Sequence, residues 1–268
     1  MILITGSSRG IGEATAYEFS RDRARVIVTY YKDRKRAEST HRKCLDLSGS
    51  DGLLLELNVA DDASINRCVR TVVATFSRID VLVNNAGTLT WTRLRDQTAD
   101  DIQNQVRTNL EGPIKMTRAC LPYVTETIIN IGSIAGKNGI KELTVCCATK
   151  FGLRGFTQAL AKEEPNINIY SVNPDYVATS MTDFVGRPPE EVARVVVRAA
   201  KGGYAVPSGS DIDVGSFHVI RTSSHLALQS VYTLTAHPSN TSYKRHTRAL
   251  AADACQPPID SRNPCVSM

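Results

Sequence analysis

The chain has 268 residues, of which 42% are hydrophobic and 22% are charged. This length and composition fit one large α/β domain with an appendage and argue against two full domains. The net charge of +5 comes from 32 basic and 27 acidic residues. Many small-molecule enzymes carry so small an excess, so the charge does not indicate a nucleic-acid partner.

Targeting signals and special covalent chemistry are also not expected. No apolar run approaches the length of about 20 residues that spans a bilayer, so no membrane partner is expected. The first strand-like run begins at residue 1, which argues against a signal peptide. The seven cysteines lack the spacing of a metal site or a disulfide framework, so we expect reduced thiols, no bound metal and a cytoplasmic location.

Short apolar runs rich in β-branched residues recur along the chain, with longer stretches of helical spacing between them. The runs cover residues 2–5, 26–30, 53–57, 81–84, 128–131 and 168–172. Their continuous apolar character is typical of strands covered on both faces, as in a parallel sheet. Alternating strands and helices with right-handed crossovers predict a doubly wound, Rossmann-type α/β fold.

The later part of the chain contains readable boundaries. Pro165 closes a helix that starts near Cys146, and Pro188 with Pro189 opens another that runs to Gly202. After about residue 216 the sequence holds four of the five histidines, only two acidic residues and no sustained periodicity. We therefore predict a folded domain over residues 1–215 and an atypical, loosely ordered tail over 216–268.

A glycine-rich turn, TGSSRGIG at residues 5–12, follows the first strand and precedes a helix expected over 13–22. Glycines let the backbone turn sharply and approach a pyrophosphate, while the free N–H groups and the positive end of the helix dipole attract its charge. This strand–turn–helix context predicts a dinucleotide site. A turn that only packs the helix on the strand is the alternative.

The turn resembles the TGxxxGxG element of the short-chain dehydrogenase/reductase (SDR) family, and Asn84-Asn85-Ala86-Gly87 resembles that family's NNAG motif. Asn58-Val59 stands where the family usually has Asp-Val near the adenine, so the side chain keeps an acceptor but loses its charge. Residues 208–215 resemble the last strand of the fold, which extends the resemblance over residues 1 to about 215. The resemblance implies a homodimer or homotetramer. The cofactor-binding residues it implies are Gly6, Ser8, Arg9, Gly10, Ile11, Gly12, Tyr30, Asn58, Val59, Asn85, Ala86, Gly87, Lys150 and Thr179.

The end of the second strand bears on which nicotinamide cofactor is used. NAD-binding proteins place an acidic residue there to accept hydrogen bonds from the ribose 2′-OH. Here the strand ends at Thr29-Tyr30-Tyr31 without a carboxylate. Arg9 and the basic residues between Lys32 and Arg36 offer cations for a 2′-phosphate. The sequence thus favours NADP(H) over NAD(H), with a solvated basic face as the alternative for the residues after the strand.

The resemblance also implies a catalytic group. Ser133 matches the serine that binds the substrate oxygen, Asn109 the asparagine that holds a proton-relay water, and Lys150 the lysine of the YxxxK element. Each of the three could instead be structural when taken singly. Four residues before Lys150, where the family has its tyrosine acid, this chain has Cys146. Positions i and i+4 share one face of a helix, so Cys146 occupies the place of the acid.

Cys146 raises the question of how a proton reaches the carbonyl oxygen. A thiol titrates near a pKa of about 8.5, and we expect a neighbouring ammonium to lower that pKa, so acidity is no obstacle. Reach is the obstacle, because the sulfur lies one phenol ring short of the tyrosine oxygen. We predict hydride transfer impaired by about 10²- to 10⁴-fold unless a water bridges. Cys146 could instead be a covalent nucleophile, which is disfavoured because no histidine lies between His41 and His218 to act as its base. A further alternative is that Cys146 is only a small residue that packs on the helix.

Two departures affect the substrate side. Thr179 matches a family threonine near the nicotinamide, but Asp175 replaces the glycine that usually follows Pro174. A carboxylate residue is awkward there if the position needs a positive φ. The connection from Thr179 to Pro188 is short, which predicts a small lid and an open pocket.

The leading hypothesis is an NADP(H)-dependent oxidoreductase of the SDR type that acts on a carbonyl or alcohol substrate. A catalytically weak or inactive NADP(H)-binding regulatory protein is its chief alternative. Nucleic-acid binding through the basic stretch 21–43 is a third hypothesis, which predicts salt-dependent affinity.

Overall fold

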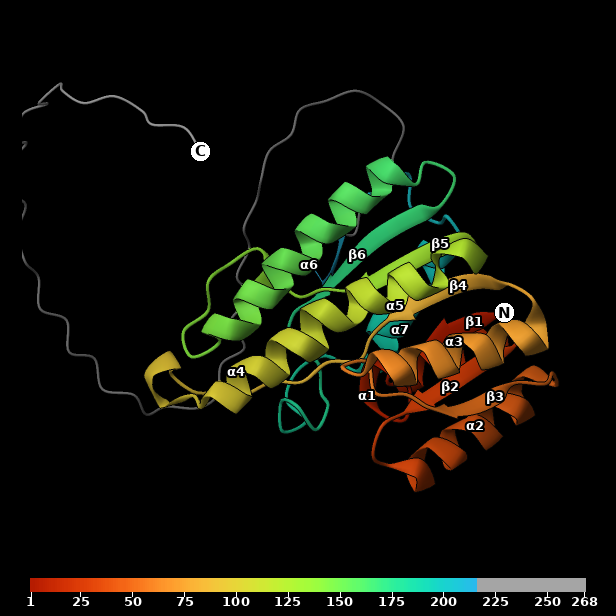
Figure 1. Cartoon of the computed structure of the whole chain (residues 1–268), viewed down its shortest axis with the longest axis horizontal. Helices are drawn as coiled ribbons and strands as arrows, with labels where there is room; N and C mark the ends of the chain where they lie inside the picture. Colours follow the sequence, from red (N-terminus) through yellow and green to blue (C-terminus); the bar gives the residue numbers. More distant parts are fainter. Residues whose placement is uncertain (216–268) are drawn as a thin grey trace, which may run out of the picture. The chain divides into compact units, whose positions relative to one another are not determined.

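A computed structural model describes residues 1–215, and these residues form a parallel sheet covered by helices on both faces (Figure 1). Within them the strands are β1 Ile2–Ile4, β2 Val26–Tyr30, β3 Leu53–Glu56, β4 Ile79–Asn84, β5 Val124–Ile131, β6 Asn168–Pro174 and β7 Asp211–Val214. Their order is β3-β2-β1-β4-β5-β6-β7, and every neighbouring pair is parallel. The predicted doubly wound, Rossmann-type fold is confirmed.

The strands differ from the expected runs mainly at their ends. β4 begins at Ile79 and β5 at Val124, two and four residues before the apolar runs that the sequence suggests. The added positions include Asp80, Thr125 and Glu126, which lie at the amino ends of the strands, where polar side chains reach solvent. An apolar run marks only the covered part of a strand, so the polar ends escape such a pattern.

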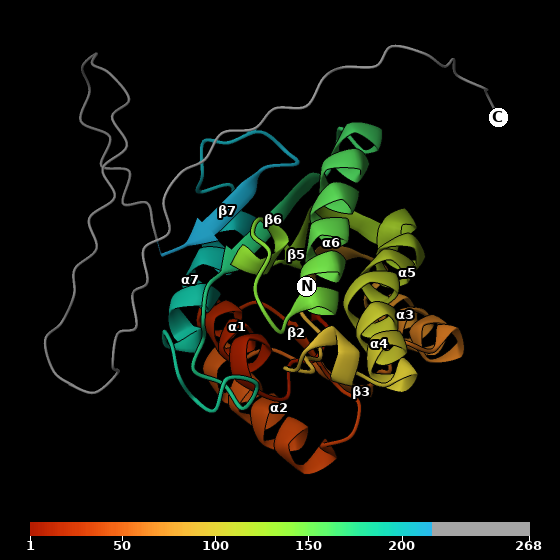
Figure 2. The ribbon, with the colours of Figure 1, turned by 90° about the vertical axis from the view of Figure 1, so that its left-hand side faces the viewer.

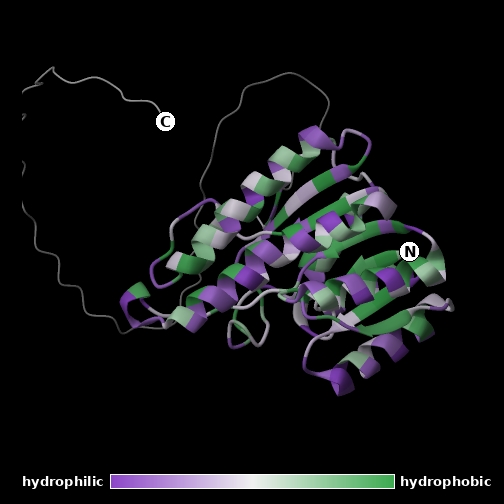
Figure 3. Ribbon diagram, viewed as in Figure 1, coloured by the Kyte–Doolittle hydropathy of each residue, from purple (hydrophilic) through white to green (hydrophobic). Residues whose placement is uncertain are grey.

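The helices divide between the two faces of the sheet (Figure 2). The described helices are α1 Gly10–Arg21, α2 Arg34–Ser48, α3 Asp62–Phe76, α4 Ala99–Val106, α5 Gly112–Cys120, α6 Thr144–Glu163 and α7 Pro189–Ala200. Buried residues of α1, α2 and α7 share one core cluster, and those of α3, α5 and α6 share the other. The hydropathy colouring agrees, since the strands are mostly apolar and the helices carry polar outer faces (Figure 3).

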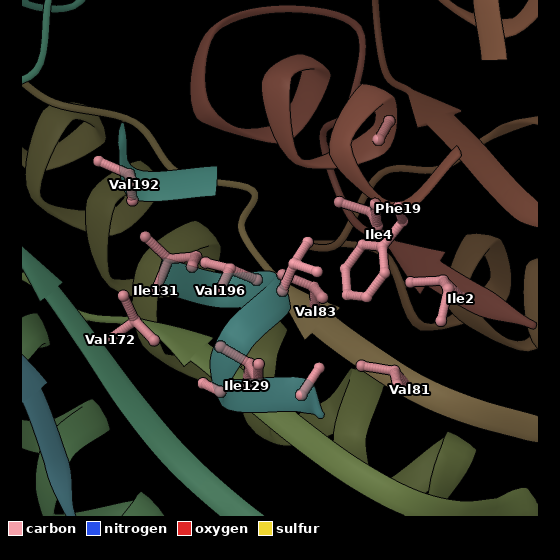
Figure 4. Close-up of a cluster of buried hydrophobic side chains, with 14 of the residues drawn as sticks. Ile2, Ile4, Phe19, Val81, Val83, Ile129, Ile131, Val172, Val192 and Val196 are labelled. Carbon is pink, nitrogen blue, oxygen red and sulfur yellow. The ribbon is translucent and has the colours of Figure 1, made fainter. Parts of the chain in front are cut away.

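Alternation along the strands explains the two cores. Ile2 and Ile4 of β1 pack in the cluster with α1 and α7, while Leu3 between them packs in the opposite cluster. Figure 4 shows the first cluster, where Phe19 of α1 and Val196 of α7 meet the strand side chains. Because successive side chains point to opposite faces, a strand covered on both sides must be apolar at every position.

The helix boundaries next to the candidate site follow local chemistry. α6 ends at Glu163, as predicted from Pro165, because the residue before a proline is restricted to extended conformations. α7 begins at Pro189, where a missing backbone N–H costs no intrahelical hydrogen bond. α1 begins at Gly10, three residues before the expected start, so the glycine turn itself forms the first helical turn.

The tail predicted over residues 216–268 lies outside the described residues. In the part of the chain that is described, no helix is both long enough and apolar enough to cross a membrane. Residues 1–215 also contain no cluster of side chains that could hold a metal ion.

Candidate active site

The candidate site lies at the carboxyl edge of the sheet, where strand order reverses. β1 pairs with β2 on one side and with β4 on the other, so the chain winds outward in both directions from this point. In open parallel sheets, ligands bind in the crevice at such a switch point. The glycine turn after β1, the NNAG segment after β4 and Ser133 after β5 all emerge at this edge.

The glycine turn has the backbone geometry that the sequence predicted. Gly6 and Gly10 have φ values of +65° and +58°, in the left-handed region that glycine adopts without strain. A Cβ on Gly12 would lie 2.5 Å from both the Asn85 side-chain nitrogen and the Gly6 carbonyl oxygen. No side chain caps the start of α1, so its first N–H groups remain available to an anion.

The NNAG segment braces this turn through hydrogen bonds. The backbone N–H groups of Asn85 and Ala86 both donate to Thr5 Oγ1 at 2.9 Å. The Asn85 side-chain amide donates to the carbonyl oxygens of Thr5 and Gly6 at 2.9 and 3.0 Å. The segments after β1 and β4, distant in sequence, are therefore held as one unit, and Asn85 acts first as a structural brace.

Ser133 and Lys150 lie together at the end of β5. Ser133 lies two residues after the last residue of this strand, and its hydroxyl oxygen accepts from the backbone N–H of Ala135 at 3.1 Å. Lys150, on α6, donates from Nζ to the carbonyl oxygen of Ile131, the last residue of β5, at 2.6 Å. A Cβ on Gly136 would lie 2.9 Å from the Lys150 carbonyl oxygen, so glycine allows this close approach of turn and helix.

Asn109 lies in a π-helical turn, Arg107–Glu111, between α4 and α5. Its side-chain oxygen accepts from the Thr88 N–H, and its side-chain nitrogen donates to the Thr88 carbonyl, both at 2.8 Å. The amide therefore fixes the segment that follows the NNAG motif. The relay water that the resemblance implies at Asn109 remains a proposal.

Comparison with known proteins agrees with this geometry. Residues 1–189 match the family model described as short chain dehydrogenase. The chain belongs to the short-chain dehydrogenase family. It is therefore related to enzymes that use nicotinamide cofactors, and the oxidoreductase class predicted from its motifs is confirmed.

Individual relatives in the family give the same assignment. The chain is 34% identical over 193 residues to a 3-oxoacyl-[acyl-carrier-protein] reductase from Synechocystis sp., covering 70% of this chain and 78% of the relative. It is 35% identical over 188 residues to an NADP-dependent 3-hydroxy acid dehydrogenase from Schizosaccharomyces pombe, covering 68% and 73%. A solved short chain dehydrogenase from Burkholderia cenocepacia in complex with NADP is 27% identical, with a TM-score of 0.75, covering 80% of this chain and 95% of that one.

Cys146, where the short-chain dehydrogenase motif has tyrosine, lies one helical turn before Lys150 on α6. It is only 9% exposed and packs with Ala135, Leu143 and Cys147. Burial raises the pKa of the Cys146 thiol, and the nearby Lys150 ammonium only partly opposes this rise. The ammonium lowers this pKa as expected, but the net shift is upward, because desolvation of the thiolate is the larger effect. Burial likewise lowers the pKa of Lys150.

The loop after β6 lies against the glycine turn. A Cβ on Gly10 would lie 3.1 Å from Thr179 Cγ2, so Thr179 lies against the turn, and its contact with the nicotinamide stays a prediction. Asp175, the second departure from the family pattern, is not among the positive-φ residues, so the conformational difficulty does not arise. Its carboxylate instead accepts from Arg187 Nε and a terminal guanidinium nitrogen, at 2.5 and 2.9 Å.

The residues predicted to select the cofactor near the end of β2 differ in their exposure to solvent. Tyr30 is 8% exposed and packs in the core, so its ring does not face the crevice. Tyr31 is 53% exposed, and the Lys32 ammonium lies 5.4 Å from its ring. Arg9 is exposed and makes no ion pair with any residue in 1–215. A cavity of about 270 Å³ beside the turn is lined by Arg9 and Arg36 together with Glu13.

Two further predicted cofactor residues lie after β3. Asn58 Oδ1 accepts from the Ala60 N–H at 3.0 Å, so the acceptor that the sequence assigned to the adenine is already used within the chain. The amide nitrogen of Asn58 remains as a donor, while Val59 is buried. An Asx turn of this kind is a local property of asparagine, but the sequence did not reveal it.

Sequence reasoning missed one contact at this edge. Trp91, after β4, and Tyr176, after β6, have stacked rings with centroids 5.9 Å apart. Neither residue belongs to a motif, and only the adjacency of the two loops in the fold brings them together.

Proposed function

We propose that the protein is an NADP(H)-dependent oxidoreductase that interconverts a carbonyl and an alcohol substrate, with a proton step weakened by Cys146. The observation that carries this proposal is the placement of Ser133 and Lys150 at the end of β5, at the same edge of the sheet as the glycine turn braced by Asn85. A bound NADPH supplies the hydride in this chemistry. The substrate class is the one that a serine hydroxyl and a nearby ammonium recognise, a carbonyl oxygen that gains negative charge.

The residues present fit a dinucleotide. The uncapped start of α1 offers backbone N–H groups to the diphosphate. A Cβ at Gly12 would clash with the Gly6 carbonyl oxygen and the Asn85 amide that hold the turn in shape. Thr179 covers the turn from the opposite loop. Asn85 is assigned to the site because it braces the turn. Ala86 and Gly87 are included because they follow Asn85, and Ser8 and Ile11 because they belong to the turn.

NADP(H) is the preferred cofactor in this proposal. The end of β2 carries Thr29, Tyr30 and Tyr31, and none of them is a carboxylate that would repel a 2′-phosphate. Arg9 stands exposed beside the turn, ready to pair with such a phosphate. The NADP-dependent relative from Schizosaccharomyces pombe and the NADP complex from Burkholderia cenocepacia support the same choice.

In the proton step, Ser133 donates its hydroxyl proton toward the carbonyl oxygen and orients the substrate. Lys150 adds a positive charge at the end of β5 that stabilises the developing alkoxide. Cys146 lies on the correct face of α6, but its short side chain is buried among apolar neighbours and its thiol pKa is raised. The thiol can therefore act only through a bridging water, and without such a water we expect hydride transfer to be about 10²- to 10⁴-fold slower.

The test compares two replacements of Cys146 with similar rings. Cys146→Tyr restores an acid at the required distance, and we expect turnover of a carbonyl substrate with NADPH to rise about 10²-fold or more. Cys146→Phe fills the same space without a hydroxyl, so its turnover should stay at the level of the parent protein. Turnover is measured from the oxidation of NADPH across a panel of aldehydes and ketones. Equal rates for the tyrosine and phenylalanine variants would contradict the assigned role of this position.

Fluorescence titrations with NADPH and NADH accompany these assays. Tighter binding of NADPH supports the cofactor assignment, and equal binding of the two would overturn it. NADPH binding without turnover of any carbonyl, in the parent and in Cys146→Tyr, would favour the second candidate, a regulatory protein that binds NADP(H). The burial of Cys146 is the specific observation in favour of that candidate.

Nucleic-acid binding has less support. Within the basic stretch 21–43, Arg21 pairs with Glu18, Arg25 with Asp51 and Arg34 with Glu38, at 2.6, 2.6 and 2.8 Å. These pairs reduce the charge that the stretch offers to a phosphate backbone.

We also propose that the protein forms the homodimer or homotetramer that the resemblance implies. The outer face of α4 carries partly exposed Ile102 and Val106 in a shallow groove, which suits contact with a second copy. Sedimentation of the purified protein tests it.

A further inference from the structure

A stacked aromatic pair joins two loops above the candidate site. Trp91 and Tyr176 have ring centroids 5.9 Å apart and ring planes inclined by 25°. The first follows β4 and the second follows β6, and β5 lies between these two strands in the sheet. Since neighbouring strands are about 4.8 Å apart, the loops must lean toward each other across the carboxyl end of β5 for the rings to meet. Ser133 extends from that same end.

The loop that carries Trp91 is fixed against the surroundings of Cys146. Leu89, two residues earlier, packs on the cluster that contains Cys146. The Thr92 N–H donates to the Glu142 carbonyl oxygen at 3.1 Å, and Arg93 lies 3.6 Å from the Glu142 carboxylate. The backbone on both sides of Trp91 is therefore anchored to Glu142 and to the cluster that contains Cys146.

The loop that carries Tyr176 is fixed at its base. Asp175 pairs with the Arg187 guanidinium, and the Arg187 N–H donates to the Tyr176 carbonyl oxygen at 2.9 Å. Despite these anchors, the side chains of Trp91 and Tyr176 stay 46% and 43% exposed. Because the backbones are anchored, the exposed rings are held in place and are open to a ligand.

Other apolar side chains gather in the same two loops. Among the described residues, Leu94 after β4 and Met181, Phe184 and Val185 after β6 are all at least 48% exposed. Apolar side chains that are exposed in these loops are available to an apolar ligand. The short connection after Thr179 leaves these side chains open to an incoming molecule.

We propose that Trp91 and Tyr176 form the ring-binding part of the substrate site, and that the substrate is a flat aromatic ketone or aldehyde. The inference rests on the proposed function, because it places the carbonyl of that substrate at Ser133. Aromatic rings attract one another in offset or edge-on arrangements beyond the effect of buried area. A saturated ring of equal size is puckered and lacks this attraction, so the site distinguishes the two.

The chain offers a direct reporter of this binding, because Trp91 is its single tryptophan. Acetophenone and cyclohexyl methyl ketone, which differ in the planarity of one ring, are titrated into full-length protein saturated with NADP⁺. Oxidised cofactor prevents turnover during the measurement. We expect acetophenone to change the tryptophan emission and to bind about threefold to tenfold more tightly than the saturated ketone.

Paired variants separate ring stacking from simple bulk. Tyr176→Leu should abolish the preference for acetophenone, whereas Tyr176→Phe should keep it. Likewise, Trp91→Leu should abolish the preference for acetophenone and Trp91→Phe should keep it. The affinities of these two variants are measured by calorimetry, because they lack the tryptophan reporter. Tyr123→Leu is the matched control, since Tyr123 is a partly exposed aromatic residue just before the amino end of β5, away from the site, and its change should leave the preference intact.

Equal affinity for the two ketones, or a preference that survives both leucine variants, would overturn the inference. If such a protein still binds NADPH and reduces an aliphatic carbonyl, the proposed function stands without it. If NADPH and NADP⁺ fail to bind, the proposed function falls and the inference falls with it.

Discussion

Single residues decide how the site works, and Cys146 and Gly12 show two different ways. Cys146 keeps the helical position of the family's acid but buries a short thiol among Ala135, Leu143 and Cys147, where burial raises its pKa. We therefore expect the replacement to weaken the proton step without disturbing the helix. Gly12 has the opposite role. It contributes no reactive group, and the turn can pack closely around it only because it has no side chain.

Gly12→Ala should abolish or strongly weaken cofactor binding. Its new Cβ would lie 2.5 Å from the Gly6 carbonyl oxygen, which is backbone and cannot move without opening the turn. We expect the Kd for NADPH, measured by fluorescence, to rise at least about tenfold. Gly155→Ala is the control, because a Cβ at this position in α6 meets nothing within 4 Å. That variant should keep its cofactor affinity and gain about 0.5–1 kcal/mol in its free energy of unfolding. NADPH binding by Gly12→Ala at the parent affinity would contradict the assigned cradle.

At the scale of elements, the loop between β6 and α7 depends on one ionic group. The Arg187 guanidinium bridges the Asp175 carboxylate after β6 and the Glu191 carboxylate in the first turn of α7. Backbone hydrogen bonds between Arg187 and both Tyr176 and Ala178 close the loop at the same place. Arg187 is 18% exposed, so these pairs are less screened than those on the surface. The carboxylate that departs from the family pattern thus acquires a structural role.

Arg187→Gln should loosen this loop and with it the contact of Thr179 on Gly10. We expect the KM for NADPH to rise about threefold to tenfold, because a fork of charged hydrogen bonds is lost, while kcat changes less. Steady-state kinetics and proteolysis within residues 179–186 measure the effect. Arg34→Gln breaks an ion pair of similar geometry whose arginine is 72% exposed, and it should change neither quantity. An unchanged KM for NADPH in Arg187→Gln would show that this loop does not contribute to cofactor binding.

At the scale of the whole described domain, the helices on both faces bury cysteines in the core. The cysteines of residues 1–215 are free and buried. That their thiols are reduced in the cell stays a prediction. Burial raises the pKa of Cys68 on α3 to about 12, and burial with a smaller contribution from Cys68 raises that of Cys120 on α5. The folded state therefore holds protons that an unfolded chain releases.

The free energy of unfolding should fall as the pH rises above about 8.5, the pKa of an unfolded thiol. The unfolded state then binds fewer protons than the folded state, so the slope is negative, up to about 1.4 kcal/mol per pH unit for each thiol. The lowered pKa of buried Lys150 acts in the opposite direction at the same time. The free energy of unfolding in urea is measured for the parent and for Cys120→Ala between about pH 8 and pH 10. Both proteins contain Lys150, so its contribution cancels in the difference between their slopes. The variant should show the shallower slope, and identical slopes would contradict the assignment.

Much of the site followed from local pattern because each motif is a short stretch with a local reason. TGSSRGIG is a turn that only glycines allow, and the strand before it is apolar at every position because both faces are covered. Ser133 and Lys150 were placed by motif and do lie together at the end of β5. Tyr30 was placed less well, because β2 is buried throughout and its last ring turns into the core.

The sequence by itself determined the fold class, the family and the chemical gap at Cys146, since periodicity, glycine turns and helical spacing are all properties of neighbouring residues. Only the tertiary structure decided the direction of the Cys146 pKa, the pairing of Asp175 with Arg187 and the contact between Trp91 and Tyr176. Each of these depends on which segments the crossovers place side by side and on how much water they exclude. Desolvation and contact between distant loops are properties of the packed chain, so no local pattern encodes them.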